Sequence, residues 1–222
     1  IAVAPYYTFG RNYQNTPVEI ACLPQDSNAV IGTFVHLDTV LGFFIDAYGP
    51  YRFSKVGYCL IPFNSGAMEH ASSIHIGKPF VNGTLTYETL WAHELAHMWW
   101  GDWITCESEG DMWLNEGFAS FNEAYMTEKL YGNAAYRDWI RTNHRKVLQF
   151  AHINDGGYLP LINIPHSHTY GQTVYNKGAN VAHTLRHYMG DSAFFPGCQA
   201  FMNTKGNSAV NSYDLRDELS NS

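Results

Sequence analysis

One short segment, His93-Glu94-Leu95-Ala96-His97, constrains this chain most, because it lies within residues 85–100, where apolar residues recur at helical spacing. Side chains four positions apart on a helix share one face, with Cβ atoms about 5–6 Å apart. Both imidazoles can therefore bind one zinc ion, while Glu94, about 100° further round the helix than His93, can reach a water on the metal. Given 11 His and ten Glu in the chain, chance ordering would produce this pattern about 0.02 times. The segment predicts a zinc-binding helix.

A zinc site of this kind needs a third protein ligand from elsewhere in the chain. Glu116 is the best candidate, because eighteen residues separate it from His97 and it lies on the next predicted helix. The short connection at residues 105–111 makes the two helices antiparallel neighbours, so that Glu116 can face the histidines. The alternative is a polar helix face with two ordinary histidines, but three tryptophans crowd the same helix, where buried polar groups would need compensation.

Composition and charge exclude several classes of protein. Hydrophobic residues make up 45% of the 222 residues and charged residues only 15%, against roughly 25% charged in ordinary soluble domains. This excludes intrinsic disorder, and the absence of any sequence repeat excludes collagen and coiled coils. A net charge of −7 without a Lys/Arg cluster disfavours nucleic acid as a partner. No apolar stretch approaches the roughly 20 residues of a membrane span.

The cysteine spacing limits the kinds of metal or disulfide framework, and the first residue indicates how the chain begins. Cys22, Cys59, Cys106 and Cys198 are far apart, so they predict neither a zinc ribbon nor a dense disulfide framework. Because the chain begins with Ile1, we expect a fragment or a processed form. Compartment and oligomeric state are not readable from the sequence.

The pattern of apolar residues predicts a first lobe that contains strands and a second lobe that is mainly helical. We expect strands and loops in residues 1–28, a helix over 29–47 that ends at Gly49-Pro50, a strand over 53–63, a turn at 64–66 and a second, antiparallel strand over 67–76. Helices are expected at about 84–101, 112–131, 133–150 and 172–189, with a loop at 154–165.

Several segments resemble the zinc aminopeptidases of peptidase family M1, which includes aminopeptidase N and leukotriene A4 hydrolase. Their order and spacing agree with the family over residues 66–178. The resemblance implies an α+β, thermolysin-like catalytic domain over residues 1–222, with an αβ lobe (1–101) that ends in the zinc helix and a helical lobe (102–222). It also implies further domains in the parent chain. The matching segments are His93 to His97, Gly101-Asp102, Trp113-Leu114-Asn115-Glu116-Gly117-Phe118-Ala119, Gly66-Ala67-Met68-Glu69-His70 and Tyr175-Asn176-Lys177-Gly178.

The resemblance implies a role for each of the central residues. One Zn²⁺ held by His93, His97 and Glu116 would keep a fourth position open for water and lower the pKa of that water to roughly 7. Glu94 would take the proton of the water and pass it to the leaving amine. Tyr175 would donate a hydrogen bond to the oxyanion, although without the resemblance a core tyrosine would be the better interpretation.

The segment Gly66-Ala67-Met68-Glu69 is expected to bind the substrate. Glu69 would anchor the free α-ammonium of a peptide by a charge-assisted hydrogen bond, and the strand could pair with an extended substrate. His70 departs from the family, which usually has Asn there. This departure leaves specificity and rate open rather than the class of reaction.

Three further residues are candidates for supporting roles. Asn115 and Glu123 could orient the zinc ligands through hydrogen bonds, and Tyr170 could assist Tyr175. For Asn115 a purely structural role explains the residue nearly as well.

The zinc motif and the resemblance to family M1 together favour a zinc-dependent aminopeptidase that acts on peptides with a free N-terminus. A thermolysin-like endopeptidase shares the zinc motif and its spacing but leaves Glu69 unexplained. An epoxide hydrolase could use the same site. A zinc-bound binding domain with weak catalysis is the non-enzymatic alternative, and the presence of Glu94 and Tyr175 speaks against it.

Overall fold

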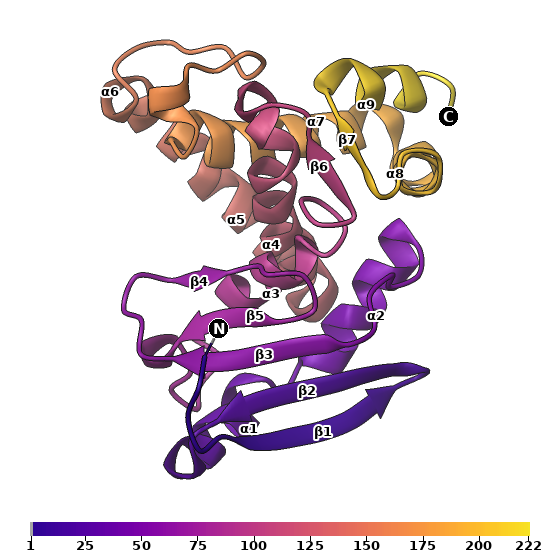
Figure 1. Cartoon of the computed structure of the whole chain (residues 1–222). Coiled ribbons are helices and arrows are strands. Elements are labelled where there is room, and N and C mark those ends of the chain that lie inside the picture. Colours follow the sequence, from indigo (N-terminus) through magenta and orange to yellow (C-terminus); the bar gives the residue numbers. More distant parts are fainter. Residues whose placement is uncertain (1) are drawn as a thin grey trace.

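The computed structural model describes residues 2–222 and places a mixed five-stranded sheet beside a group of helices (Figure 1). The strand order is β1-β2-β3-β5-β4. β1 and β2 are antiparallel, β2, β3 and β5 run parallel, and β4 lies at the edge, antiparallel to β5. The α+β fold class is thereby confirmed. The strands are β1 Tyr7–Tyr13, β2 Thr16–Cys22, β3 Val56–Ile61, β4 Ala67–Met68 and β5 Ile74–Gly77.

The second predicted strand was wrong in extent and partly in direction. Residues 67–76 form two strands, and β5 pairs with β3 in parallel rather than antiparallel fashion. The cause is a tight turn between them, in which Ser73 N–H donates to His70 O at 2.8 Å and Ser72 has a positive φ of 59°. This turn reverses the chain and leaves β4 as a two-residue edge strand.

The helix predicted over residues 29–47 is broken into α1 (Ser27–Thr33) and α2 (Leu37–Tyr48). Gly32 and Thr33, which are weak helix formers, lie directly before the break. The Thr33 hydroxyl also accepts a hydrogen bond from Gly83 N–H at 3.0 Å, which ties the end of α1 to a distant loop. α2 ends at Gly49, as expected, where φ is 90°.

Helix α3 (Glu88–Ala96), which was predicted to bind zinc, is shorter than the predicted 84–101. His97 is its C-cap residue and keeps helical dihedral angles, so it still lies one turn after His93. α3 packs against α4 (Glu116–Tyr131), which crosses the core and also contacts α5 (Asn133–Lys146) and α7 (Gly178–Met189). A stacked pair of rings, Trp100 and Phe118, lies between the two helices with centroids 3.7 Å apart.

The remaining elements complete the second half of the chain. The helices predicted at 133–150 and 172–189 correspond to α5 and α7, each joined to a π-helical turn, η4 (Val147–Ala151) and η6 (Thr173–Lys177). The division into lobes at residue 101 remains a prediction. The helix predicted at 112–131 is divided into the end of η3 (Glu109–Leu114) and α4. Elements that the sequence did not predict are η1 (Pro24–Asp26), η2 (Lys78–Phe80), β6 (Ile104–Cys106), α6 (His152–Asn154), η5 (His166–His168), α8 (Asp191–Thr204), β7 (Ser208–Val210) and α9 (Ser212–Leu219).

No single helix within residues 2–222 has both the length and the apolar character needed to cross a bilayer. The bent pair Pro24–Thr33 and Leu37–Tyr48 meets that test together, by length and composition alone. All four cysteines are free thiols.

Candidate active site

The buried end of α3 and its C-cap residue carry His93, Glu94 and His97. Trp91 and Leu95 are fully buried in the core, while His93, Glu94 and His97 line a cavity of about 540 Å³, here called the metal-site cavity. All three polar side chains are at least nine-tenths buried. Polar groups so deeply buried require partners, because burial without them costs free energy.

Glu116, the first residue of α4, is the partner of both histidines. Its Oε2 lies 3.2 Å from Nε2 of His93 and 3.3 Å from Nε2 of His97. The ligand atoms of the three residues all lie within 4.8 Å of one another. Two imidazole nitrogens and one carboxylate oxygen are the donor set of a catalytic zinc site with an open fourth position.

The second nitrogen of each imidazole is engaged on the protein side. His93 Nδ1 lies 3.0 Å from Glu123 Oε1, and His97 Nδ1 lies 2.9 Å from the carbonyl oxygen of Trp100. Since a carbonyl can only accept, His97 Nδ1 carries a hydrogen and donates it, which leaves Nε2 as the atom that faces Glu116 and that can bind a metal once its own proton is lost. These contacts orient both rings toward one point, so the residues present fit a zinc ion.

The charges of the site are strongly coupled. Burial lowers the pKa of His97, but the Glu116 carboxylate outweighs burial and raises it to about 9. Burial likewise opposes protonation of His93, and the Glu116 and Glu123 carboxylates raise its pKa well above the usual range. Burial alone would raise the pKa of Glu116, but the two histidines hold it well below that of an ordinary carboxyl. The site therefore favours a positive charge between these residues.

Glu94 and Glu69 form an acidic pair next to the histidines. Ligand atoms of Glu69, Glu94 and His97 lie within 4.8 Å of one another. Burial raises the pKa of Glu94, the two histidines lower it, and Glu69 and Glu116 raise it further. A carboxylate with a raised pKa near a metal site is suited to accept a proton.

Glu69 directly follows β4, the strand at the edge of the sheet. Its side chain lines the metal-site cavity, as do Gly66, Ala67 and Met68. Ala67 and Glu69 are half-buried, whereas Met68 and His70 are exposed, which agrees with the alternation expected of an extended strand. Gly66 has a φ of 120°, a conformation that favours glycine.

His70 lies apart from the metal ligands. Its ring packs edge-on against His75 of β5, with centroids 4.9 Å apart and planes at 85°. His70 belongs to neither of the groups within residues 2–222 that could hold a metal ion.

Tyr175 enters the site from the π-helical turn η6. Its ring is parallel to that of His93, with centroids 6.1 Å apart and planes at 8°. Burial and the nearby Glu116 carboxylate raise the pKa of Tyr175 well above its usual range, so the phenol keeps its hydrogen and can donate it. Tyr170 lines the same cavity but is 71% exposed.

Asn115 contacts the backbone rather than a zinc ligand. Its side-chain oxygen accepts from Cys106 N–H at 3.1 Å, and its nitrogen lies 3.4 Å from Thr105 Oγ1. It therefore attaches β6 to the start of α4. Of the candidates for orienting ligands, Glu123 contacts a histidine and Asn115 does not.

Asp155 and Gly171 were missed by the reading of the sequence. The buried Asp155 carboxylate accepts from the backbone N–H groups of Gln172, at 3.0 Å, and Thr173, at 2.6 Å, where the helical turn that carries Tyr175 begins. A Cβ on Gly171 would lie 2.7 Å from Asp155 Oδ1. Asp155 lies in Asn-Asp-Gly-Gly, which reads only as a turn, so no local signal could have identified it.

Comparisons with known proteins agree with this arrangement. A sequence profile for the peptidase family M1 domain matches residues 36–222. Aminopeptidase N of Streptomyces lividans is 31% identical over 90% of this chain and 26% of its own length. Aminopeptidase N of Oryctolagus cuniculus is 30% identical over 74% of this chain and 19% of its own length. The chain thus spans about a quarter or less of these relatives.

Among solved structures, an M1 zinc metallopeptidase from Deinococcus radiodurans superimposes with a TM-score of 0.76 at 24% sequence identity. The match covers 97% of this chain and 47% of that one. This likeness supports the fold.

Proposed function

The chain belongs to peptidase family M1, and from that premise we propose that it is the catalytic part of a zinc-dependent aminopeptidase, which hydrolyses the first peptide bond of peptides with a free N-terminus. The observation that carries the proposal is the convergence of His93, His97 and Glu116 beside the two carboxylates Glu94 and Glu69. Bound zinc would supply a Lewis acid and bring the ionisation of water into the neutral pH range.

Glu94 would act as the general base and then as the general acid. Its carboxylate lies beside the ligand atoms of His97, and burial raises its pKa, which makes it a better proton acceptor than an ordinary carboxylate. It would accept a proton from the attacking water and deliver it to the nitrogen of the leaving amine.

Tyr175 would stabilise the developing charge on the carbonyl oxygen of the cleaved bond. It is the phenol next to His93 and, with its raised pKa, it remains a hydrogen-bond donor throughout the neutral range. Donors of this kind contribute about 10²–10³ in rate when they are aimed at the oxyanion.

Glu69 would determine where the peptide is cut. An aminopeptidase must bind the α-ammonium one residue away from the cleaved bond, and a half-buried carboxylate close to Glu94 and His97 is suited to that role. Activation of water requires only Glu94, and binding of the α-ammonium gives a role to Glu69, the second carboxylate of the acidic pair.

A Glu94→Gln variant tests the proposal. We expect the variant to retain zinc, because Glu94 is not one of the three converging ligands, and to lose turnover by at least about 10²-fold. Zinc content and peptide hydrolysis are measured on the full chain. A matched control is Glu109→Gln, which removes an exposed carboxylate whose partner is His166. Unchanged turnover in Glu94→Gln would refute the proposed role of this residue.

A further inference from the structure

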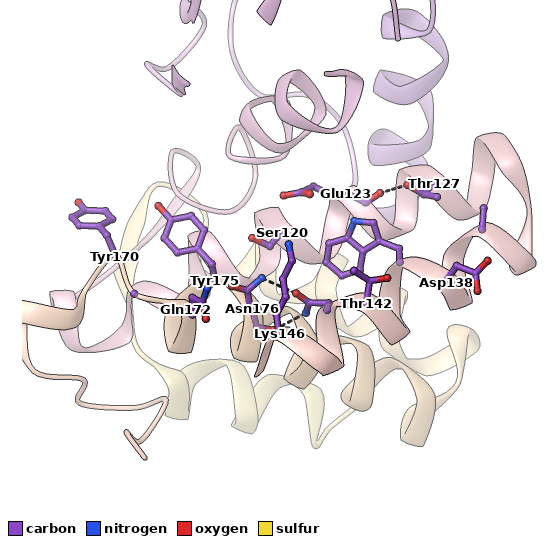
Figure 2. Close-up of a pocket in the computed structure, with 14 residues that line it drawn as sticks. Ser120, Glu123, Thr127, Asp138, Thr142, Lys146, Tyr170, Gln172, Tyr175 and Asn176 are labelled. Atoms are coloured by element: carbon purple, nitrogen blue, oxygen red, sulfur yellow. Dashed lines mark hydrogen bonds between the residues drawn. The ribbon is translucent and has the colours of Figure 1, made fainter. Parts of the chain in front are cut away.

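A second cavity, of about 830 Å³, adjoins the metal-site cavity. The two have Glu123, Tyr170 and Tyr175 in common, so the metal-site cavity continues past Tyr175 into the second one. Figure 2 shows the residues that line the second cavity. Nothing in the proposed chemistry uses this second cavity.

One face of α5 forms a wall of the second cavity. Trp139, Thr142, Asn143 and Lys146 all line it, and their spacing of three and four residues places them on the same side of the helix. Figure 2 shows the Lys146 side chain rising from α5 toward Ser120 of α4, with Tyr175 and, beyond it, Tyr170 on one side and Asp138 on the other.

The positions of the two cavities give the substrate a direction. Glu69 lines the metal-site cavity and does not line the second one. If the free amino end of a peptide lies at Glu69 and the first bond lies at the metal ligands, the rest of the peptide must leave elsewhere. The second cavity adjoins the first at Tyr175, so the residues after the cleaved bond, which advance roughly 3.3 Å each in an extended chain, would pass Tyr175 and enter it.

Lys146 is the only lysine or arginine among residues 2–222 that lines the second cavity. The two carboxylates in its walls already have partners: Glu123 is bonded to His93 and Asp138 to Arg141. Neither forms an ion pair with Lys146. The ammonium group is therefore available to a carboxylate that enters the cavity with a substrate.

We infer that the second cavity binds the part of a peptide that follows the cleaved bond, and that Lys146 selects peptides with a carboxylate there. This inference rests on the proposed aminopeptidase function and adds a class of preferred substrate to it. The carboxylate could be the C-terminus of a short peptide or the side chain of an acidic residue.

The test compares kcat/KM for matched peptides on the zinc-loaded full chain. Ala-Ala-Ala with a free C-terminus is paired with its C-terminal amide, and Ala-Ala-Glu-amide is paired with Ala-Ala-Gln-amide. We expect each carboxylate peptide to be preferred by about two- to fivefold, since the ion pair is partly exposed to solvent. Lys146→Met should remove the preference, and Lys146→Glu should invert it. A preference in one pair alone identifies the source of the carboxylate.

Arg145→Met is the matched control, because Arg145 is the preceding residue on α5 and lines a different groove. This variant removes one positive charge from the same helix but not from the second cavity, so it should keep the preference for carboxylate peptides. A preference that is absent from the unmodified chain, unaffected by Lys146→Met, or lost equally in Arg145→Met would overturn the inference.

A further arm separates this inference from the proposed function. Alanine 4-nitroanilide lacks the residues that would reach Lys146, and Arg145→Met should hydrolyse it at the rate of the unmodified chain. If no substrate is cleaved at all, the proposed function fails. The same peptide pairs are then compared by their dissociation constants for Glu94→Gln, alone and combined with Lys146→Met. A carboxylate preference in binding that depends on Lys146 would support the inference, and one independent of Lys146 would overturn it.

Discussion

Gly117 of α4 and Gly178 of α7 pack backbone against backbone, so that a Cβ on either would lie 2.8 Å from the Cα of the other. Glu116 precedes the first glycine, and Tyr175 comes three residues before the second. The close approach of the two backbones therefore brings a zinc ligand candidate and the candidate oxyanion donor to the same cavity. Both glycines serve by their lack of a side chain, because neither has a positive φ.

Gly117→Ala should destabilise the protein and impair the site together. An added methyl group at a backbone contact must push α4 and α7 apart, and such overpacking costs about 1–3 kcal/mol. We expect a lower free energy of unfolding by denaturant and a lower kcat, because Tyr175 moves relative to Glu116.

Gly10→Ala is the control for this prediction, since a Cβ at Gly10 in β1 meets no atom within 4 Å. It should leave kcat unchanged. If Gly117→Ala were as active and as stable as this control, the packing of the two glycines would not position the site.

Asp155→Ala should lower kcat more than it raises KM. The carboxylate accepts two backbone hydrogen bonds at the start of the turn that carries Tyr175, and its loss leaves two N–H groups unpaired. Asp155→Asn keeps one acceptor oxygen and should restore part of the activity. Steady-state kinetics of both variants decide, and equal kcat values in all three proteins would contradict the positioning role.

Glu123→Gln should weaken zinc binding by about 10–100-fold, as expected when the carboxylate partner of a metal-binding histidine is removed. Glu123 is the partner of His93 Nδ1 at 3.0 Å. The dissociation constant is measured by competition with a chelator. Glu109→Gln, which alters the exposed pair with His166, should bind zinc as the unmodified chain does.

Zinc affinity should increase with pH through the neutral range. Glu116 raises the pKa of His97 to about 9, so at lower pH zinc must displace a proton from this ring. For each displaced proton the affinity rises about tenfold per pH unit. The proton itself stabilises the folded chain without zinc: the raised pKa gives a contribution that is complete below about pH 6.5 and is lost as pH rises through about 9.

Calorimetry in buffers of different ionisation enthalpy gives the number of protons released. At least one proton per zinc near pH 7.5 is the expected result. Binding without proton release and without pH dependence would show that zinc does not bind at His97.

Helices with a regular spacing of apolar residues could be predicted from the sequence. The directions of strands, which depend on pairing with distant parts of the chain, could not. The apolar period predicted α5 and α7, which bury residues at helical spacing, and α4, which is buried on nearly all sides over residues 116–126 because it crosses the core. The direction of β5 was predicted wrongly because the residues within 67–76 contain no signal that identifies the neighbouring strand. The pairing of β5 with β3 depends on the whole chain between them.

The same distinction applies to the site. His93 and His97 could be paired from their spacing on one helix, and Glu116 from the length of the connection. Asp155 could not, because it reaches Gln172 and Thr173 through a fold that brings a turn residue to the start of a distant helix. Asn115 was a candidate for orienting a zinc ligand, with a structural role as a nearly equal alternative, and its contact with Cys106 agrees with the structural role.

The most direct test of the central claim uses the zinc-loaded full chain and two peptides that differ only by an acetyl group on the N-terminus. The account predicts that the first residue is released from the free-amine peptide alone, and that Glu69→Gln lowers this activity sharply while zinc remains bound. Cleavage of both peptides at equal rates, or cleavage at internal bonds, would contradict the account and indicate an endopeptidase-like cleft.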